Sequence, residues 1–172
     1  MPRKVIEVGC GAGVYLNELK SVWGSHCVGI DPSETAITYG RYKFPKLELK
    51  QGTAIDLRLE MLAGRHYDLV IFGFCLYLLD RADLFKVVAY ADGILNTGGH
   101  LAIHDFDVGR EATVLPYHHR PGLFSYKMDY PALWLANPSY RLVSKTQTNE
   151  KENSALTILR KGTWQEKFDH GN

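Results

Sequence analysis

The sequence predicts an α/β fold with a seven-stranded, mostly parallel sheet that ends in an antiparallel hairpin and carries helices on both faces. Three observations predict it. Short apolar runs alternate with segments of helical periodicity over roughly the first hundred residues. A glycine-rich segment separates the first apolar run from the first helix. Near the C-terminus, apolar runs at 142–148 and 155–160 are joined only by the polar residues 149–153, too short for a crossover helix.

The first half of the predicted sheet consists of two strand-helix units. An apolar run at 4–8 predicts the first strand, and near-helical spacing of apolar residues at 14–22 predicts the helix after it. A second strand is predicted at 26–30. Ser33 is placed to cap a second helix that continues to about Arg41.

The remaining elements lie between turn signals. Strands are predicted at 47–50, 67–72 and 100–104, helices at 83–95 and 131–136, and a turn at 96–99. The stretch 105–129 is rich in Pro, Gly, His and Tyr and is predicted to be irregular. We therefore expect one domain, residues 1–172, with an insert at 106–130.

Length, charge and cysteine content narrow the function classes. A chain of 172 residues fits one domain, and its formal charge of +1 gives no excess to attract nucleic acid. The three cysteines are scattered and form no metal or disulfide pattern, so we expect a cytoplasmic protein without a structural metal. No apolar run reaches the roughly 20 residues of a membrane helix, so no membrane partner is expected.

The glycine-rich loop and the end of the second strand predict a nucleotide-type site. Residues 9–13 read Gly-Cys-Gly-Ala-Gly, so the backbone can approach a ligand and present N–H groups at a helix start. Asp31 ends the next strand, where a carboxylate accepts hydrogen bonds from ribose hydroxyls. The structural alternative is a tight turn and a helix cap with no ligand. A nicotinamide dinucleotide is the rival ligand, but its G-x-G-x-x-G fingerprint differs from this G-x-G-x-G loop, which Glu7 precedes.

In order, these motifs resemble those of the class I S-adenosylmethionine-dependent methyltransferases, from about Lys4 to Lys161. The resemblance implies a Rossmann-like sheet, S-adenosylmethionine as cofactor and S-adenosylhomocysteine as product. Residues 7–13 resemble the motif that holds the methionine part, 29–33 the ribose-binding turn, and 52–54 the segment that faces adenine. The implied cofactor-binding residues are Glu7, Gly9, Cys10, Gly11, Gly13, Asp31, Pro32, Thr53, Ala54, Gly73 and Phe74.

The sequence departs from the family pattern at three places. Many members carry an acidic residue where Thr53 stands, and Asp56 is the nearest substitute. No Asn-Pro-Pro-Tyr type tetrapeptide follows the fourth strand, which argues against methylation of exocyclic base nitrogens or glutamine amides. The helices that usually precede the first strand are missing before Lys4, so we expect a second copy of the chain or a partner subunit to cover the site.

The acceptor site is predicted at the carboxyl end of the fifth strand and in the insert that follows. Transfer to oxygen or nitrogen usually needs a base, and the candidate catalytic residues are His104, Asp105, His118 and His119. The insert at 106–130 is longer than structural connections usually are, which predicts an acceptor lid; a plain surface loop is the alternative. Adjacent histidines without clustered carboxylates or cysteines do not predict zinc.

These observations predict methyl transfer from S-adenosylmethionine to a small polar acceptor. A loose resemblance of the insert to small methyltransferases of bacterial surface-polysaccharide biosynthesis implies a sugar or nucleotide-sugar hydroxyl as that acceptor. Two alternatives stay open: a nicotinamide-dependent oxidoreductase, and a non-catalytic module that binds S-adenosylmethionine or a partner protein.

Overall fold

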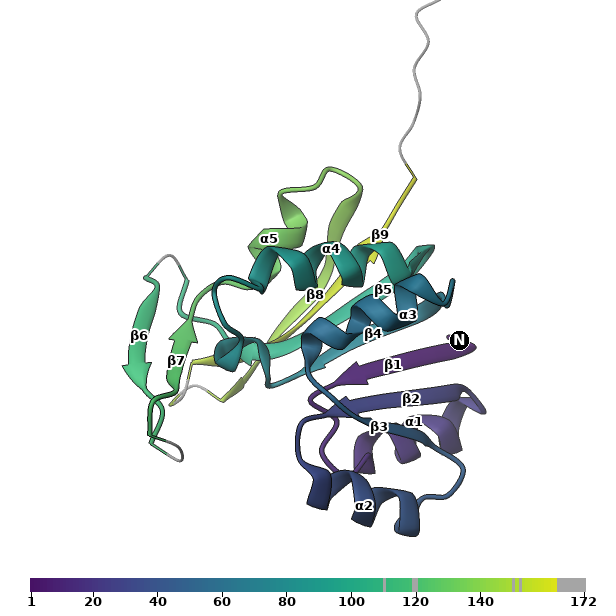
Figure 1. Cartoon of the computed structure of the whole chain (residues 1–172). Coiled ribbons are helices and arrows are strands. Elements are labelled where there is room, and N and C mark those ends of the chain that lie inside the picture. Colours follow the sequence, from purple (N-terminus) through teal and green to yellow (C-terminus); the bar gives the residue numbers. More distant parts are fainter. Residues whose placement is uncertain (110, 119–120, 150, 152, 164–172) are drawn as a thin grey trace, which may run out of the picture.

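The main sheet has the predicted seven strands, mostly parallel, with an antiparallel hairpin at its end. The computed structural model describes residues 1–109, 111–118, 121–149, 151 and 153–163. The strand order is β3-β2-β1-β4-β5-β9-β8, and a separate two-stranded sheet pairs β6 with β7. The strands are β1 Lys4–Val8, β2 His26–Asp31, β3 Glu48–Gln51, β4 Tyr67–Gly73, β5 Leu95–Phe106, β6 Thr113–Pro116, β7 Phe124–Lys127, β8 Tyr140–Asn149 and β9 Ser154–Lys161. β1 to β5 run parallel and β9 pairs antiparallel with β5 and β8, which confirms the predicted fold (Figure 1).

Helices cover both faces of this sheet, as predicted. They are α1 Val14–Trp23, α2 Glu34–Lys43, α3 Leu57–Leu62, α4 Leu84–Ile94 and α5 Pro131–Leu135, with single 3-10 turns η1 Ala54–Asp56 and η2 Leu76–Leu78. α1 and α2 pack on one face, whereas α3, α4 and α5 pack on the other (Figure 1). Within the described residues, no helix is both long and apolar enough to cross a membrane.

Local sequence explains where the first helices begin and end. Gly24 ends α1 in the left-handed conformation, with a φ of 68°, and its N–H donates to the carbonyl oxygen of Lys20 at 2.8 Å. The Ser33 hydroxyl accepts a hydrogen bond from the N–H of Ala36 at 3.2 Å, so the predicted cap of α2 is confirmed.

The turn predicted at 96–99 is wrong, because those residues lie inside β5. Tyr67 of β4 pairs with Leu95 and Leu69 pairs with His100, so β5 accommodates extra residues as a bulge. Gly98 has a φ of +83°, which supplies the conformation that the irregularity needs. The fifth strand therefore begins at Leu95 and not at His100.

α3 is absent from the predicted elements, since this helix does not bury its apolar side chains in a regular pattern. Its Glu60 is buried, with hydrogen bonds from the Lys50 ammonium and the Tyr67 hydroxyl, whereas Leu59 and Leu62 are exposed. A helix that turns a carboxylate inward and two of its three leucines outward has no amphipathic period to detect.

Part of the stretch predicted to be irregular forms the β6–β7 hairpin. Thr113 pairs with Lys127 and Pro116 with Phe124, in antiparallel register. All four residues of β6 are exposed, so no alternation of apolar and polar residues marks this strand. In Figure 1 the hairpin lies beyond the carboxyl ends of the parallel strands.

The sheet divides the core into two clusters. The larger cluster lies on the α3, α4 and α5 face and includes Phe72 and Trp134, whose ring centroids are 5.6 Å apart. The smaller cluster lies on the α1 and α2 face and includes Leu16, Ile37 and Leu49.

Candidate functional site

The loop between β1 and α1 forms the floor of the candidate site. Gly9, Gly11 and Gly13 all have positive φ angles, which glycine adopts without strain. The N–H groups of Gly9 and Cys10 both donate to the carbonyl oxygen of Ile30, at 2.9 and 3.3 Å, so the loop is held against the end of β2.

The three glycines differ in the space around them. A Cβ atom on Gly9 would lie 2.7 Å from the carbonyl oxygen of Gly73 and 2.9 Å from the Cβ of Cys75. A Cβ on Gly11 would meet no atom within 4 Å. Gly9 therefore allows β1 and β4 to approach each other, while the backbone at Gly11 faces open space.

Asp31 at the end of β2 connects the glycine loop to α2. Its Oδ2 accepts a hydrogen bond from the N–H of Gly11 at 2.8 Å, and its Oδ1 accepts one from the N–H of Ser33 at 2.9 Å. The side chain is half-buried and Pro32 beside it is exposed. An ionised carboxylate has about four lone-pair positions, so two stay available for a ligand.

Glu7 of β1 is a buried carboxylate beside this loop. Its side chain is 5% exposed, and Oε2 has no hydrogen-bond partner among the described residues. A Cβ on Gly73 would lie 2.9 Å from Oε1 of Glu7, so a side chain there would displace this carboxylate. Burial, followed by the negative charge of Asp31, raises the pKa of Glu7 to about 7. A buried carboxylate oxygen without a donor has the capacity to accept a hydrogen bond from a ligand N–H or ammonium group.

The loop after β3 lies beside the end of β2. The N–H of Gly52 donates to the backbone carbonyl oxygen of Asp31 at 3.0 Å, and Thr53 and Ala54 follow directly after this contact. Asp56, considered above as a substitute acidic residue, accepts a hydrogen bond from the N–H of Thr53 at 2.7 Å. One oxygen of Asp56 is therefore engaged in capping η1.

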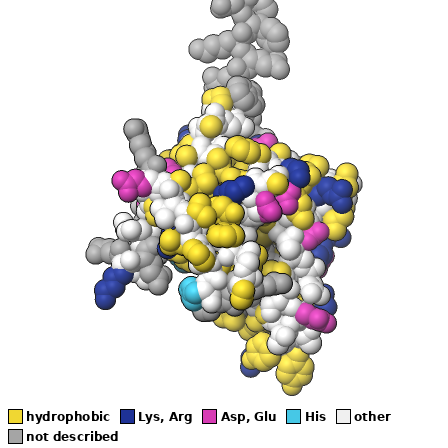
Figure 2. Space-filling view, turned by 60° about the vertical axis from the view of Figure 1, so that its left-hand side comes forward, with side chains coloured by type: hydrophobic (Ala, Val, Ile, Leu, Met, Phe, Trp, Pro, Cys, Tyr) yellow, Lys and Arg dark blue, Asp and Glu magenta, His cyan; other side chains and the backbone are white. Residues whose placement is uncertain are grey.

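Phe74 follows β4 and lies in a group of aromatic rings. Its φ of 55° is unusual for a residue with a side chain, and its N–H donates to the carbonyl oxygen of His104 at 2.8 Å. Its ring centroid lies 5.3 Å from Tyr77, 5.1 Å from His104 and 5.0 Å from Phe106. Figure 2 turns this end of the molecule toward the viewer and shows hydrophobic side chains gathered over its middle, with most charged side chains around them.

The Cys10 thiol in this loop is buried and packs against the protein interior. A Cβ on Gly29 would lie 2.6 Å from the Cys10 sulfur, so this thiol points toward β2. Burial raises the pKa of Cys10 to about 12 and keeps it neutral. Cys10 therefore offers a ligand its backbone and not its thiol.

The predicted catalytic residues lie in different environments. His104 is half-buried at the end of β5, and its Nε2 lies 3.1 Å from the Thr148 hydroxyl oxygen. Burial lowers its pKa, which favours the neutral ring. His118 is exposed after β6, with its ring centroid 5.6 Å from that of Tyr117, and His119 lies outside the described residues.

The Asp105 carboxylate is buried and accepts hydrogen bonds from backbone N–H groups. Its side chain is 2% exposed; Oδ2 accepts a hydrogen bond from the N–H of Leu76 at 2.9 Å, and Oδ1 accepts one from the N–H of Phe106 at 2.8 Å. Burial raises its pKa to about 7, although these N–H donors oppose the shift. Asp105 thus fixes η2, which carries Tyr77.

Arg81 also holds η2, because its guanidinium group donates hydrogen bonds to backbone carbonyl oxygens there. It was not among the residues predicted from the sequence. Its Nη2 donates to the carbonyl oxygens of Leu76 at 3.2 Å and Leu79 at 2.6 Å. Its guanidinium carbon lies 4.4 Å from the ring centroid of Tyr126 in β7, so Arg81 also ties the hairpin to η2. No local motif in a single sequence marks such a residue. Among the described residues, no group of three or more His, Cys, Asp or Glu side chains could hold a metal ion.

Comparisons with known proteins agree on one family. The family model described as "Methyltransferase domain" matches residues 5–99. Over 124 residues, 69% of this chain, the sequence is 28% identical to a Mycobacterium tuberculosis (strain H37Rv) protein named "Probable S-adenosylmethionine-dependent methyltransferase". A protein of Alkaliphilus oremlandii named "Uncharacterized methyltransferase" is 23% identical over 58% of this chain. The matches cover 43% and 44% of these relatives, so the chain spans less than half their length.

Solved structures share the fold at low identity. The match to Streptomyces venezuelae DesVI has a TM-score of 0.66 at 20% identity, and it covers 92% of this chain and 84% of the DesVI chain. The 1,6-didemethyltoxoflavin-N1-methyltransferase of Burkholderia thailandensis was solved with S-adenosylhomocysteine. Its match has a TM-score of 0.73 at 15% identity and covers 93% of this chain and 71% of that enzyme's chain. Because the matched family model spans more than half of the residues and these structures share the topology, the chain belongs to the methyltransferase domain family.

Proposed function

We propose that the edge of the sheet at the carboxyl ends of β1, β2 and β4 binds S-adenosylmethionine and that the chain transfers its methyl group to a small polar acceptor. The observation that carries this proposal is the unpartnered oxygen of buried Glu7, which lies beside the open glycine loop and Asp31. A cofactor with an ammonium group and a ribose satisfies both carboxylates at once. The names of the matched relatives support the same reading.

Each part of the cofactor has a matching group in the chain. Glu7, together with the backbone around Gly9 and Gly73, would hold the methionine part. The two free lone-pair positions of Asp31 would accept hydrogen bonds from the ribose hydroxyls, and Thr53 with Ala54 would face the adenine. The backbone of Gly11 and Gly13 would line the binding position of the cofactor, and the open space at Gly11 leaves room for it.

His104 is the residue that we propose as the base. The cofactor supplies an electrophilic methyl group, so the protein has to orient the acceptor, exclude water and remove a proton. The Thr148 hydroxyl lies 3.1 Å from His104 Nε2 and 2.9 Å from the Ser154 hydroxyl oxygen. These two linked hydroxyl groups orient the imidazole ring. With Nε2 donating to Thr148, Nδ1 accepts the acceptor's proton. Asp105 and Arg81 position η2, and so Tyr77.

The acceptor that we propose is a sugar or nucleotide-sugar hydroxyl, and residues 106–130 are its lid. Phe74, Tyr77 and Phe106 offer flat faces for a ring, and neutral His104 beside them suits a hydroxyl. The test is a screen of nucleotide-sugars with isotopically labelled S-adenosylmethionine, read by mass spectrometry. We expect a labelled product that His104→Ala strongly reduces. Label found only on a nucleobase or on protein would contradict this acceptor class.

Cofactor identity is tested by calorimetric titration with S-adenosylhomocysteine and, in parallel, with NAD. We expect micromolar binding of S-adenosylhomocysteine that weakens about tenfold or more in Asp31→Ala, since hydrogen bonds to a charged group contribute about 1.5–3 kcal/mol. Glu18→Ala removes an exposed carboxylate from α1 and serves as the control. Binding of NAD alone would overturn the proposal, and binding without turnover of any acceptor would favour the non-catalytic module.

The affinity for S-adenosylhomocysteine should also increase as the pH rises through about 7. Glu7 gains its negative charge near that pH, and the carboxylate then attracts the ligand's ammonium group. Glu7→Gln removes the titrating group, so we expect a flatter profile and weaker binding at pH 8. Calorimetry at pH 6, 7 and 8 measures both proteins. An equal pH profile in Glu7→Gln and the parent would rule out this role for Glu7.

A further inference from the structure

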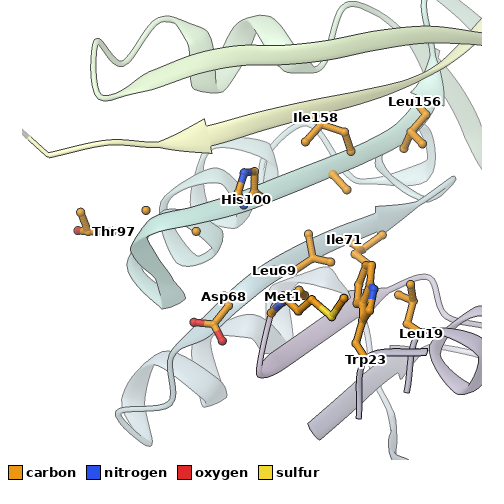
Figure 3. A pocket seen from close by; sticks show the side chains of 14 residues that line it. Met1, Leu19, Trp23, Asp68, Leu69, Ile71, Thr97, His100, Leu156 and Ile158 are labelled. Atoms are coloured by element: carbon orange, nitrogen blue, oxygen red, sulfur yellow. The ribbon is translucent and has the colours of Figure 1, made fainter. Parts of the chain in front are cut away.

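A cavity of about 740 Å³ on the α1 face of the sheet does not suit a small polar acceptor. Its lining is mainly apolar and includes Trp23, Leu69 and Ile158 (Figure 3). Ala102 of β5 lines this cavity, but His104, the proposed base, is not among the described residues that line it. We therefore looked for groups that bind the acceptor nearer the carboxyl end of β5, among the aromatic rings.

Lys127 brings a positive charge to these rings. It is the last residue of β7, and its ammonium nitrogen lies 3.8 Å from the ring centroid of Phe106. The Phe106 centroid lies 5.0 Å from that of Phe74 and 5.1 Å from that of Tyr77. His104 and Phe106 are two residues apart in a regularly paired part of β5, so their side chains leave the same face of the sheet, roughly 7 Å apart. One small molecule can therefore contact both His104 and Lys127.

The ammonium group of Lys127 lacks a partner of opposite charge. In the part of the chain that the structure describes, its nitrogen forms no ion pair and donates no hydrogen bond. An ammonium group has three N–H donors, and the face of one ring attracts the charge without satisfying all three. The side chain is half-buried, so solvent surrounds it only in part.

The carboxylates nearest in sequence leave this charge uncompensated. Asp105 accepts hydrogen bonds from backbone N–H groups, and Asp107 forms an ion pair with Lys145 at 2.7 Å. Asp129 lies two residues after Lys127 but forms no ion pair with it or with any other described residue. The hairpin side of the aromatic rings therefore offers a positive charge to a ligand.

We propose that Lys127 binds an anionic group of the acceptor, a phosphate or a carboxylate, so that the acceptor is an anionic sugar derivative and not a neutral sugar. The anionic group contacts the ammonium nitrogen, the ligand's rings lie against Phe106 and Phe74, and its hydroxyl faces His104. Attraction between opposite charges is stronger where solvent is partly excluded. This inference rests on the proposed function, because it specifies the charge of the acceptor for the same site.

Calorimetric titration of the chain saturated with S-adenosylhomocysteine tests this assignment. The anionic probes are UDP-glucose, glucose 1-phosphate and glucuronate, and the neutral probe is methyl glucoside. We expect the anionic probes to bind about tenfold more tightly than methyl glucoside, and we expect added salt to reduce the difference. Tighter binding of the two phosphorylated probes than of glucuronate would identify phosphate as the group that Lys127 binds, and the reverse order would identify carboxylate.

Three variants separate this role from a structural one. Lys127→Gln removes the charge and should abolish the preference for anionic probes while the affinity for methyl glucoside stays the same. Lys127→Arg keeps the charge and should retain most of the preference. Lys46→Gln makes the same charge change at an exposed position after α2 and serves as the control. A purely structural contact with Phe106 would change thermal unfolding, followed by circular dichroism, but not the preference.

The outcomes distinguish this inference from the proposed function. Equal binding of all four probes, no binding of any anionic probe, a preference that survives in Lys127→Gln, or an equal loss in Lys46→Gln would overturn the role of Lys127. If S-adenosylhomocysteine binds in the same experiment, the proposed cofactor site stands. The titrations are repeated without S-adenosylhomocysteine, so that a preference due to Lys127 is measured even where the chain does not bind the cofactor product, which would contradict the proposed function.

Discussion

Gly9→Ala should lose most of its affinity for S-adenosylhomocysteine, by about tenfold to a hundredfold, whereas Gly11→Ala should lose far less. Both glycines have positive φ angles, so alanine costs about 1–2 kcal/mol of backbone strain at either position. Only at Gly9 does the added carbon also overlap other atoms, namely the carbonyl oxygen of Gly73 and the Cβ of Cys75. We therefore expect β1 and β4 to move apart at the floor of the site.

Because the two substitutions add the same atom, the difference between them isolates the steric effect. Calorimetric titration measures the affinity, and circular dichroism confirms that both variants are folded. Equal affinities in Gly9→Ala and Gly11→Ala would mean that the approach of β1 to β4 does not shape the binding site.

Trp134→Ala should lower the free energy of unfolding by about 3–5 kcal/mol, the usual cost of truncating a buried tryptophan to alanine. The Trp134 side chain is 1% exposed and packs against Phe72 in the larger core cluster. For a chain of this size, the loss corresponds to a fall in Tm of roughly 10 °C. Urea unfolding followed by circular dichroism provides the measurement.

Two variants test whether this loss comes from packing. Trp134→Phe keeps most of the apolar volume and removes an indole N–H that has no hydrogen-bond partner among the described residues. We therefore expect Trp134→Phe to lose clearly less stability than Trp134→Ala. Leu135→Ala alters the neighbouring side chain, which is 40% exposed, and should stay within about 1 kcal/mol of the parent. A loss in Leu135→Ala as large as that in Trp134→Ala would show that α5 is fragile as a whole.

The regular strand-helix units were predictable, because each carries its own signal. Apolar runs bounded by turn residues placed β1, β2 and β4, and the periodicity of α4 placed that helix. The glycine loop and Asp31 were identifiable as neighbours, since the ends of adjacent parallel strands meet at one edge of the sheet. The direct hydrogen bond between Asp31 and Gly11 agrees with this expectation.

What escaped prediction depends on partners distant in sequence. The bulge in β5 exists because Leu95 and His100 both pair with β4, which no local pattern reveals. The position of Asp105 at the end of β5 predicts a catalytic carboxylate, but no local pattern reveals that this carboxylate accepts hydrogen bonds from the backbone N–H groups of Leu76 and Phe106. A buried carboxylate that fixes a turn and one that binds a ligand look alike in one sequence.

The unequal size of the two core clusters bears on how the molecule opens. Among the described residues, the cluster beneath α1 and α2 contains nine buried side chains, whereas the cluster on the opposite face contains twenty-one. Local opening needs less free energy where fewer apolar side chains are buried, so amide hydrogens of α1 and α2 exchange with solvent ahead of those of α4. Those two helices also follow the glycine loop and Asp31. A ligand bound there adds its own binding free energy to the cost of opening, and slowed amide exchange in α1 and α2 therefore reports occupancy before any methylated product is known.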